Sequence, residues 1–517
     1  MSLARNVATV GGITLLSRVL GFVRDVLIAA ALGTGIVADA FFVAFQVANL
    51  ARRLLAEGAL NAAIVPLYLR ARDHGGEGAA AAFAGELAGT LTICMTALAL
   101  LLAFLGPIVV LFLAPGFTPH GPRLDAGVDL LRLTLPYLAF AAPVAVLMSV
   151  LNANHRFAPA ALGTVAFNAT MLAVLFLILK LRGGDSLSGR LLAGGVALAG
   201  MAQMGLVVTA VWIGPERVAP LRIAFGRAMR RFLTLAIPAL IATGIPQIAI
   251  IGGVMVASES QSAVSWLYYA NRLVELPLGV VGIAVGTVLV PALTHALRSG
   301  DRAELAAAES RGIELALGLT LPAAIALAIL ARPTVGVLFQ HGAFTAADAA
   351  ETAAALVAFS FGLPGHVLVK ALAPAFFARE DTTTPMHAAL LGFAAALAGS
   401  LVLFPIFGHV GVAAAIALSG WIAAALLGLL IGRRGEFLLD GAARRRLPRI
   451  VAAGCVMGIV VAVANKFMGA TLAAGGPEGA LALFGIIAAG LLTYTVLTHV
   501  LGIATMRQLF AGLGGKL

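Results

Sequence analysis

Apolar runs of about 20 residues recur from one end of the chain to the other, and they limit its fold more than any other feature. Each run is long enough to cross about 30 Å of hydrocarbon as an α-helix. Hydrophobic residues make up 61% of the 517 residues and charged residues 11%, whereas soluble domains carry about 25% charged residues. The sequence therefore predicts an all-α polytopic membrane protein without a sizeable soluble domain.

Fourteen transmembrane helices fit these runs. The predicted spans are 8–32, 38–69, 85–113, 130–152, 158–180, 190–213, 232–257, 263–294, 312–331, 350–376, 386–407, 410–431, 447–468 and 479–501. An even number of spans places both termini on one side of the membrane. Arginine is concentrated in the loops of that side, as at 227–231 and 444–446, so the positive-inside rule predicts that both termini are cytoplasmic.

The basic loops are too short to hold a folded nucleic-acid-binding module, so we expect no nucleic-acid partner. Their charge is explained by topology and by contacts with anionic membrane lipids. The two cysteines lie in predicted spans, and the histidines show no metal-ligand spacing. We therefore predict no metal site, no cofactor and no catalytic residue.

The two halves of the chain resemble each other at a shift of about 225 residues. The segment NAAIVPLYLR, with Pro66, aligns with GTVLVPALTH, with Pro291. The segment NANHRFAP, with Pro159, aligns with REDTTTP, with Pro385. At this shift spans 1 to 6 fall on spans 7 to 12, which indicates an internal duplication.

Because six spans is an even number, the two repeats have the same orientation in the membrane. Parallel repeats of this kind enclose a central site in several transporter folds. We therefore predict two parallel six-helix lobes around a central cavity, residues 1–225 and 226–440. Two additional C-terminal helices follow in residues 441–517.

Charged residues interrupt the first apolar run within the stretch SRVLGFVRD. On a helical wheel Ser17, Arg18, Arg24 and Asp25 fall in one wedge of about 120°. A charge at the bilayer centre costs about 2.5–3.5 kcal/mol on insertion scales, so the wedge should face protein or a water-filled cavity. Arginine's planar guanidinium suits bidentate binding of phosphate.

Two further spans carry charged residues. Span 2 contains Asp39 near its outer end and Asn49, Arg52, Arg53 and Glu57 toward the cytoplasm. Arg53 and Glu57 are four residues apart, so they can pair on one helix face.

Span 8 contains Arg272 and Glu275, three residues apart. The second repeat lacks the charges of span 1, because Thr243, Ala249 and Ile250 occupy the matching positions. The cations of spans 1, 2 and 8 are candidate phosphate ligands, and structural ion pairs between helices remain the alternative.

Several long motifs resemble the MurJ (MviN) family of bacterial lipid II flippases. They are SRVLGFVRD, DAFFVAF followed by NLARRLLAEGA, YANRLVELPLGVVGIAVGTVLVP, LFQHGAFT and LAPAFFARED. The resemblance implies the fold of the multidrug/oligosaccharidyl-lipid/polysaccharide exporter superfamily. It also implies that the chain moves undecaprenyl-diphosphate-linked peptidoglycan precursor from the inner to the outer leaflet of the bacterial cytoplasmic membrane by alternating access.

On the matching motifs, Arg18, Arg24 and Arg272 are implied to bind the lipid diphosphate. Asp39, Arg52, Arg53 and Glu57 match polar positions of the family. The groove beside the two extra helices is implied to hold the polyprenyl tail. The chain has Ala48 before Asn49 where family members often have proline.

Three other functions compete with a flippase. The first is a cation-coupled exporter of drugs or of another lipid-linked oligosaccharide; an exporter of cationic drugs should have an acidic cavity. The second is an enzyme acting on polyprenyl phosphates, which would need an aspartate-rich motif such as DDxxD, and the sequence has none. The third is a non-transporting scaffold for the cell-wall synthesis machinery, which is also a candidate partner of a flippase. Coupling to the membrane potential or to an ion is left open by the sequence.

Overall fold

The protein is described here by a computed structural model that is almost entirely helical. The described residues are 3–56, 59–181, 183–299, 301–379, 381–433 and 439–503. They form two compact units, Met1–Ser265 and Trp266–Leu517. The predicted boundary between the two repeats near residue 225 stays a prediction.

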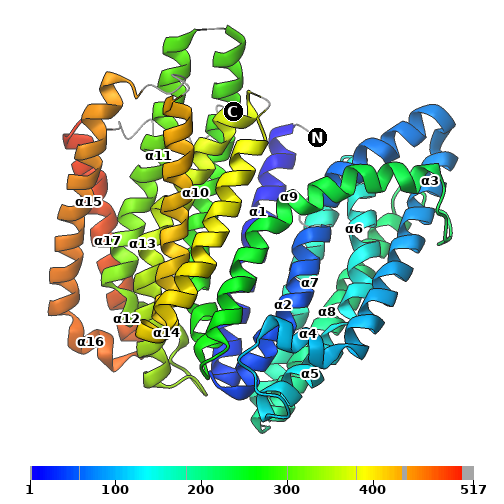
Figure 1. The fold of residues 1–517 in the computed structure, drawn as a ribbon, viewed down its shortest axis with the longest axis horizontal. Coiled ribbons are helices and arrows are strands. Elements are labelled where there is room, and N and C mark those ends of the chain that lie inside the picture. The colour runs from blue at the N-terminus through cyan, green and yellow to red at the C-terminus, as the bar shows by residue number, and fades with distance from the viewer. Residues whose placement is uncertain are drawn as a thin grey trace. The chain divides into compact units, whose positions relative to one another are not determined.

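In the described part of the first unit the chain forms helices α1 to α9 (Figure 1). They are α1 (Leu3–Leu32), α2 (Ile36–Ala56), α3 (Ala59–Phe104), α4 (Gly106–Leu113), α5 (Pro122–Thr134), α6 (Tyr137–Ala153), α7 (Phe157–Leu181), α8 (Asp185–Trp212) and α9 (Arg227–Ala257). Helix α1 packs on α7, α2 on α5, and α3 on both α6 and α9. A core of buried apolar side chains joins α3, α6 and α9.

The second unit holds the remaining helices, except that the first turn of α10 belongs to the first unit. They are α10 (Ala263–Ser299), α11 (Arg302–Ile329), α12 (Ala331–Phe339), α13 (Ala346–Phe377), α14 (Thr383–Arg433), α15 (Gly441–Phe467), α16 (Gly469–Ala474) and α17 (Gly476–Val500). Helix α13 packs on α11 and α14. The two extra helices predicted from the sequence are α15 and α17, which pack on each other and, through α15, on α11.

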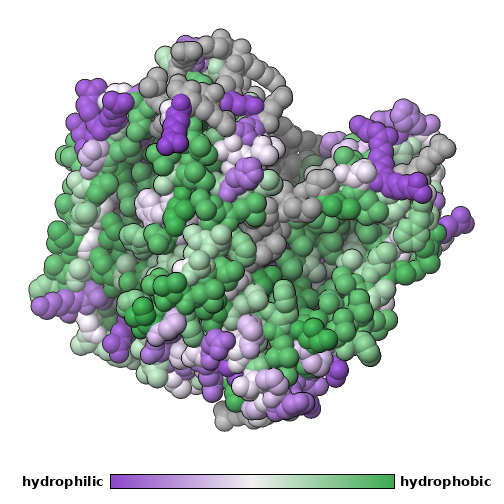
Figure 2. Space-filling view, viewed as in Figure 1, coloured by the Kyte–Doolittle hydropathy of each residue, from purple (hydrophilic) through white to green (hydrophobic). Residues whose placement is uncertain are grey.

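Each predicted span falls largely on a helix, and nine helices of the described residues are long and apolar enough to cross a membrane. Figure 2 shows hydrophilic side chains gathered toward the helix ends and hydrophobic ones along the helix sides. The all-α membrane fold is confirmed, and the count of fourteen crossings remains a prediction.

Two long helices are interrupted at a glycine. The backbone of Gly76 in α3 has φ 71°, and that of Gly408 in α14 has φ 56°. Glycine accepts this left-handed region because it has no Cβ atom. The break in α3 therefore separates predicted spans 2 and 3, and the break in α14 separates spans 11 and 12.

The helix boundaries repeat along the chain. A shift of 225 residues moves Gly106–Leu113 to 331–338, and α12 is Ala331–Phe339. The same shift moves α1 close to α9, and α7 close to the part of α14 before Gly408. The order of elements thus supports the duplication that the aligned prolines predicted. Helix α9 opens the second repeat in sequence, yet it packs with α2, α3 and α4 of the first unit.

Candidate functional site

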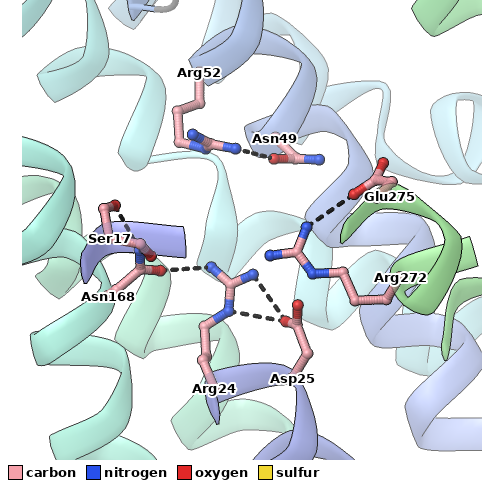
Figure 3. A network of polar contacts seen from close by, with 8 residues as sticks. All are labelled: Ser17, Arg24, Asp25, Asn49, Arg52, Asn168, Arg272 and Glu275. Atoms are coloured by element: carbon pink, nitrogen blue, oxygen red, sulfur yellow. Dashed lines mark hydrogen bonds and ion pairs between the residues drawn. The ribbon is translucent and has the colours of Figure 1, made fainter. Parts of the chain in front are cut away.

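A buried network of polar side chains connects α1 to α7 (Figure 3). The Arg24 guanidinium donates to Asp25 Oδ1 from Nε at 3.0 Å and from Nη2 at 2.8 Å. Its third nitrogen, Nη1, donates to Asn168 Oδ1 at 3.1 Å. Asn168 Nδ2 in turn donates to the backbone oxygen and the Oγ of Ser17 at 3.0 and 3.2 Å. We call these four residues the α1 network.

The α1 network holds a charge pair inside an apolar helix bundle. Arg24 is 6% exposed and Asp25 is 0% exposed. The guanidinium also lies 5.6 Å from the ring centroid of Phe45. Because all three nitrogens of Arg24 have an acceptor, the side chain is fixed in position. The prediction that Asp25 holds an arginine is confirmed for Arg24.

Arg18 has a different environment on the same helix. Its side chain is exposed, and it forms no hydrogen bond or ion pair within the described part of the chain. Asp25 is committed to Arg24, so it does not neutralise Arg18. The wedge predicted on α1 therefore contains one neutralised guanidinium and one that carries its full charge.

The polar residues of α2 form a smaller group. Arg52 Nη2 donates to Asn49 Oδ1 at 2.9 Å, and both side chains are partly buried (Figure 3). Asn49 is neutral, so this contact orients the guanidinium without cancelling its charge. Arg53 is also partly buried. Its predicted partner Glu57 lies outside the described residues.

The pair predicted on α10 is present in the second unit. Arg272 Nη1 donates to Glu275 Oε2 at 2.8 Å, and Asn271 Nδ2 donates to Glu275 Oε1 at 3.3 Å. Both partners of the ion pair are about one-fifth exposed. Glu275 therefore positions Arg272, whose side chain is partly exposed.

Asp39 lies at the start of α2 and is 0% exposed. Its Oδ1 accepts from the backbone nitrogen and the Oγ of Ser265, at 3.0 and 2.6 Å. Its Oδ2 accepts from the backbone nitrogen of Ser262 at 2.7 Å and from Arg123 Nη2 at 3.2 Å. We call these four residues the Asp39 cluster.

The Asp39 cluster satisfies backbone groups that a helix start leaves open. The first turns of an α-helix have N–H groups without an intrahelical partner. Asp39 accepts two such groups at the start of α10, and its negative charge suits the positive end of the helix dipole. Arg123 adds a bond to the backbone oxygen of Ser260 at 3.2 Å. The cluster thus ties the α9–α10 loop to α2.

No group of three histidine, cysteine, aspartate or glutamate side chains suited to a metal ion occurs among the described residues.

Comparison with known proteins places the chain in a family. Residues 28–476 match the family described as lipid II flippase MurJ. The chain belongs to the MurJ family. A probable lipid II flippase MurJ of Rhizobium meliloti is 39% identical over 98% of this chain and 96% of its own length. The lipid II flippase MurJ of Burkholderia cenocepacia is 32% identical over 88% of this chain and 89% of its own length.

Solved structures agree with the MurJ fold. A MurJ structure in an inward closed conformation matches with a TM-score of 0.78, covering 97% of this chain and 99% of that one at 23% identity. A multidrug resistance MATE transporter of the MOP superfamily, in an inward-facing conformation, matches with a TM-score of 0.67 at 15% identity. It covers 83% of this chain and 98% of that one. The fold predicted from the family resemblance is confirmed.

Four residues of the α1 network and the Asp39 cluster were not predicted from the sequence. Asn168 is an isolated amide in the apolar run GTVAFNATMLAV, and that isolation was a usable signal because polar residues inside spans are costly. Arg123, Ser262 and Ser265 stand in or beside loops, where such residues are common. Only the packing of α2 against those loops brings them to Asp39.

Proposed function

We propose that this chain moves lipid II, the undecaprenyl-diphosphate-linked peptidoglycan precursor, from the inner to the outer leaflet of the bacterial cytoplasmic membrane. It acts as a transporter by alternating access, with both termini in the cytoplasm. Membership of the MurJ family and the helical transporter fold support this proposal. The observation that carries it is the state of the α1 arginines: Arg24 is buried and fixed, and Arg18 is accessible and not neutralised.

The cationic side chains of α1, α2 and α10 are the proposed ligands of the diphosphate. They are Arg18, Arg24, Arg52, Arg53 and Arg272. Ser17, Asp25, Asn49, Glu57 and Glu275 are proposed to hold them in position. A hydrogen bond to a charged group contributes about 1.5–3 kcal/mol, so losing one arginine should weaken binding about tenfold or more.

The membrane potential can assist this transport. Moving one charge across the membrane is worth about 2.3 kcal/mol per 100 mV. With the cytoplasm negative, outward movement of an anionic headgroup is favoured, and so is the inward return of an empty cationic site. The polyprenyl tail is proposed to stay in lipid beside α15 and α17.

The Asp39 cluster is proposed to act as a gate on the outer side. On the predicted topology the α9–α10 loop faces the cell exterior, and the cluster holds this loop to α2. Release of the loop would require Asp39 to give up two backbone N–H groups and one hydroxyl. The cluster therefore stabilises the arrangement in which this loop is closed over α2.

The test is a lipid II translocation assay in proteoliposomes, comparing Arg18→Gln, Arg18→Lys and Arg433→Gln. Arg18→Gln should lower the initial rate at limiting lipid II about tenfold or more, for the reason given above. Arg18→Lys should lie between this variant and wild type, because lysine keeps the charge and loses the planar fork. Arg433 is exposed at the end of α14, so Arg433→Gln is the matched control and should transport normally.

A wild-type rate in Arg18→Gln would contradict the proposed role of Arg18. Transport of a cationic dye without transport of lipid II would favour the drug-exporter alternative instead.

A further inference from the structure

The connector between α8 and α9, residues 213–226, has no regular secondary structure and is bonded along α3 (Figure 1). Ala219 donates its N–H to Ala81 O at 3.0 Å, and Arg222 donates to Gly85 O at 3.4 Å. Farther along, Ala224 N donates to Thr90 Oγ1 at 3.1 Å. From Ala81 to Thr90 an α-helix rises about 13 Å. The connector therefore follows α3 lengthwise instead of crossing it.

Two glycines of α3 allow this close approach. A Cβ atom at Gly85 would lie 2.5 Å from the carbonyl oxygen of Ala219, and one at Gly89 would lie 2.5 Å from that of Arg222. Both distances are shorter than real Cβ contacts, so any larger residue would push the connector away. Gly85 and Gly89 thus leave the room on α3 that the connector backbone occupies.

An ion pair fixes the beginning of the connector. Glu216 Oε2 accepts from Arg156 Nη1 at 2.5 Å, and the Glu216 carboxylate is almost fully buried. Arg156, in the α6–α7 loop, also donates to Ala210 O at 2.9 Å. The connector is therefore attached to the first unit at both its beginning and its middle.

Three large apolar side chains of the attached connector nevertheless remain uncovered. Leu221 is 58% exposed, Ile223 is 59% exposed and Phe225 is 66% exposed. They occupy alternate positions, as side chains on one side of an extended segment do. Leaving such a side chain in water forfeits about 1.5–3 kcal/mol of burial energy each. Three exposed apolar side chains on a segment that is hydrogen-bonded to α3 indicate that they lie in apolar surroundings.

The position of the connector along α3 identifies that surrounding. Before the contact region, the exposed side chains of α3 include Asp73, His74 and Glu77. Beyond it they include Ile93 and Leu100. The connector thus lies where the surface of α3 changes from charged to apolar, which is the level of the membrane interface.

The residues beside the three apolar side chains fit an interfacial position. Trp212 ends α8 and is largely exposed, and tryptophan is enriched at membrane interfaces. Arg217 and Arg222 are exposed on the connector, and arginines near a membrane surface attract anionic lipid headgroups. On the predicted topology this is the cytoplasmic leaflet.

We propose that the connector is a membrane-interface anchor. Leu221, Ile223 and Phe225 insert among the acyl chains just below the headgroups of the cytoplasmic leaflet, and Arg217 and Arg222 lie at the level of the anionic phosphates. This is a lipid-binding surface on the connector between the two repeats, separate from the arginines proposed to bind the transported diphosphate.

The test uses full-length protein in nanodiscs that contain an anionic phospholipid. Cys94 and Cys455 are first replaced by alanine. Single cysteines at positions 221, 223 and 225 are then spin-labelled, and their accessibility to oxygen is compared with that to a water-soluble nickel chelate. Ile93→Cys in the apolar part of α3 gives the lipid reference, and Glu77→Cys gives the water reference.

The three labels should show an oxygen-to-nickel accessibility ratio several-fold above that of Glu77→Cys and close to that of Ile93→Cys. An Arg222→Cys label, at the position expected to lie at the level of the phosphates, should give a lower ratio than its two neighbours. Nickel accessibility equal to that of Glu77→Cys at all positions would overturn the proposal, since the connector would be an aqueous loop. Low accessibility to both reagents would also overturn it, since protein would then cover the surface.

Discussion

The ion pairs of Asp25 and Asp39 both lie in the first unit, and they connect different kinds of neighbour. The α1 network joins α1 to α7, two helices of the same repeat. The Asp39 cluster joins α2 to the α9–α10 loop, which belongs to the second repeat in sequence. Both carboxylates are fully buried. The two carboxylates are therefore alike in burial and in having an arginine partner. They differ in the segments that would separate if the bonds were broken.

This difference predicts a division of roles. The α1 network stabilises the interior of one lobe and should persist throughout a transport cycle. The Asp39 cluster holds a connection between repeats, so its bonds have to exchange when that connection moves. Substitutions in the α1 network should lower the free energy of unfolding most. Substitutions in the Asp39 cluster should change the conformation of the α9–α10 loop more than the free energy of unfolding.

The largest effect is expected from Asp25→Leu. It leaves the Arg24 guanidinium buried without its carboxylate, and breaking a buried pair in this way costs about 3–5 kcal/mol. The free energy of unfolding in detergent, measured by denaturant titration, checks this. The matched control is Arg24→Met combined with Asp25→Leu, which removes both charges and should regain most of the stability while transport stays lost. Equal stability of Asp25→Leu and wild type would show that the pair does not support the lobe.

Asp39→Asn should have a smaller effect on stability, about 1–3 kcal/mol, because the amide oxygen can still accept from Ser265. The main change should be in conformation, since Arg123 loses its charge partner. Ser258 is fully buried in the α9–α10 loop region, so a Ser258→Cys label site reports release of this loop. In a background without the native cysteines, Asp39→Asn should raise maleimide labelling of that site from outside the cell. Unchanged labelling would mean that Asp39 is a structural cap and not a gate.

The smallest effect is expected from Asn168→Ala, about 1 kcal/mol in the free energy of unfolding. Arg24 keeps both bonds to Asp25, while its bond to Asn168 and the two bonds from Asn168 to Ser17 are lost. Asn168→Asp is the informative companion, because it retains an acceptor and adds a second negative charge beside Arg24. That variant also loses the donor to the Ser17 carbonyl oxygen, so we expect it to be less stable than wild type and to transport lipid II more slowly. If both variants transport at the wild-type rate, the charge of Arg24 does not contribute to substrate binding.

The sequence was sufficient for features that depend on neighbours along the chain. The apolar runs predicted the helices, the spacing of Ser17, Arg24 and Asp25 placed them on one face of α1, and Arg272 and Glu275 were near enough to pair. The aligned prolines predicted the repeated element order. The shared face of the α1 residues and the pairing of Arg272 with Glu275 follow from helical geometry.

Features that depend on tertiary packing were not predictable in this way. The bond from Asn168 to Ser17 spans 151 residues and that from Ser265 to Asp39 spans 226. Third and fourth spans were predicted without interruption, yet their helices break at Leu105 and Pro136. Pro107 and Pro136 stand at these breaks, but a proline alone does not predict a break, because Pro143 lies inside α6.

The placement of α9 has a consequence for where the chain passes from one unit to the other. Because α9 packs within the first unit, the polypeptide passes from one unit to the other at a single peptide bond, between Ser265 and Trp266. The long connector of residues 213–226 lies wholly inside one unit and need not lengthen or shorten during a cycle. The peptide bond between Ser265 and Trp266 lies in the first turn of α10, and Asp39 binds Ser265, the last residue before it. A single carboxylate of α2 thus holds the first turn of the helix with which the second unit begins.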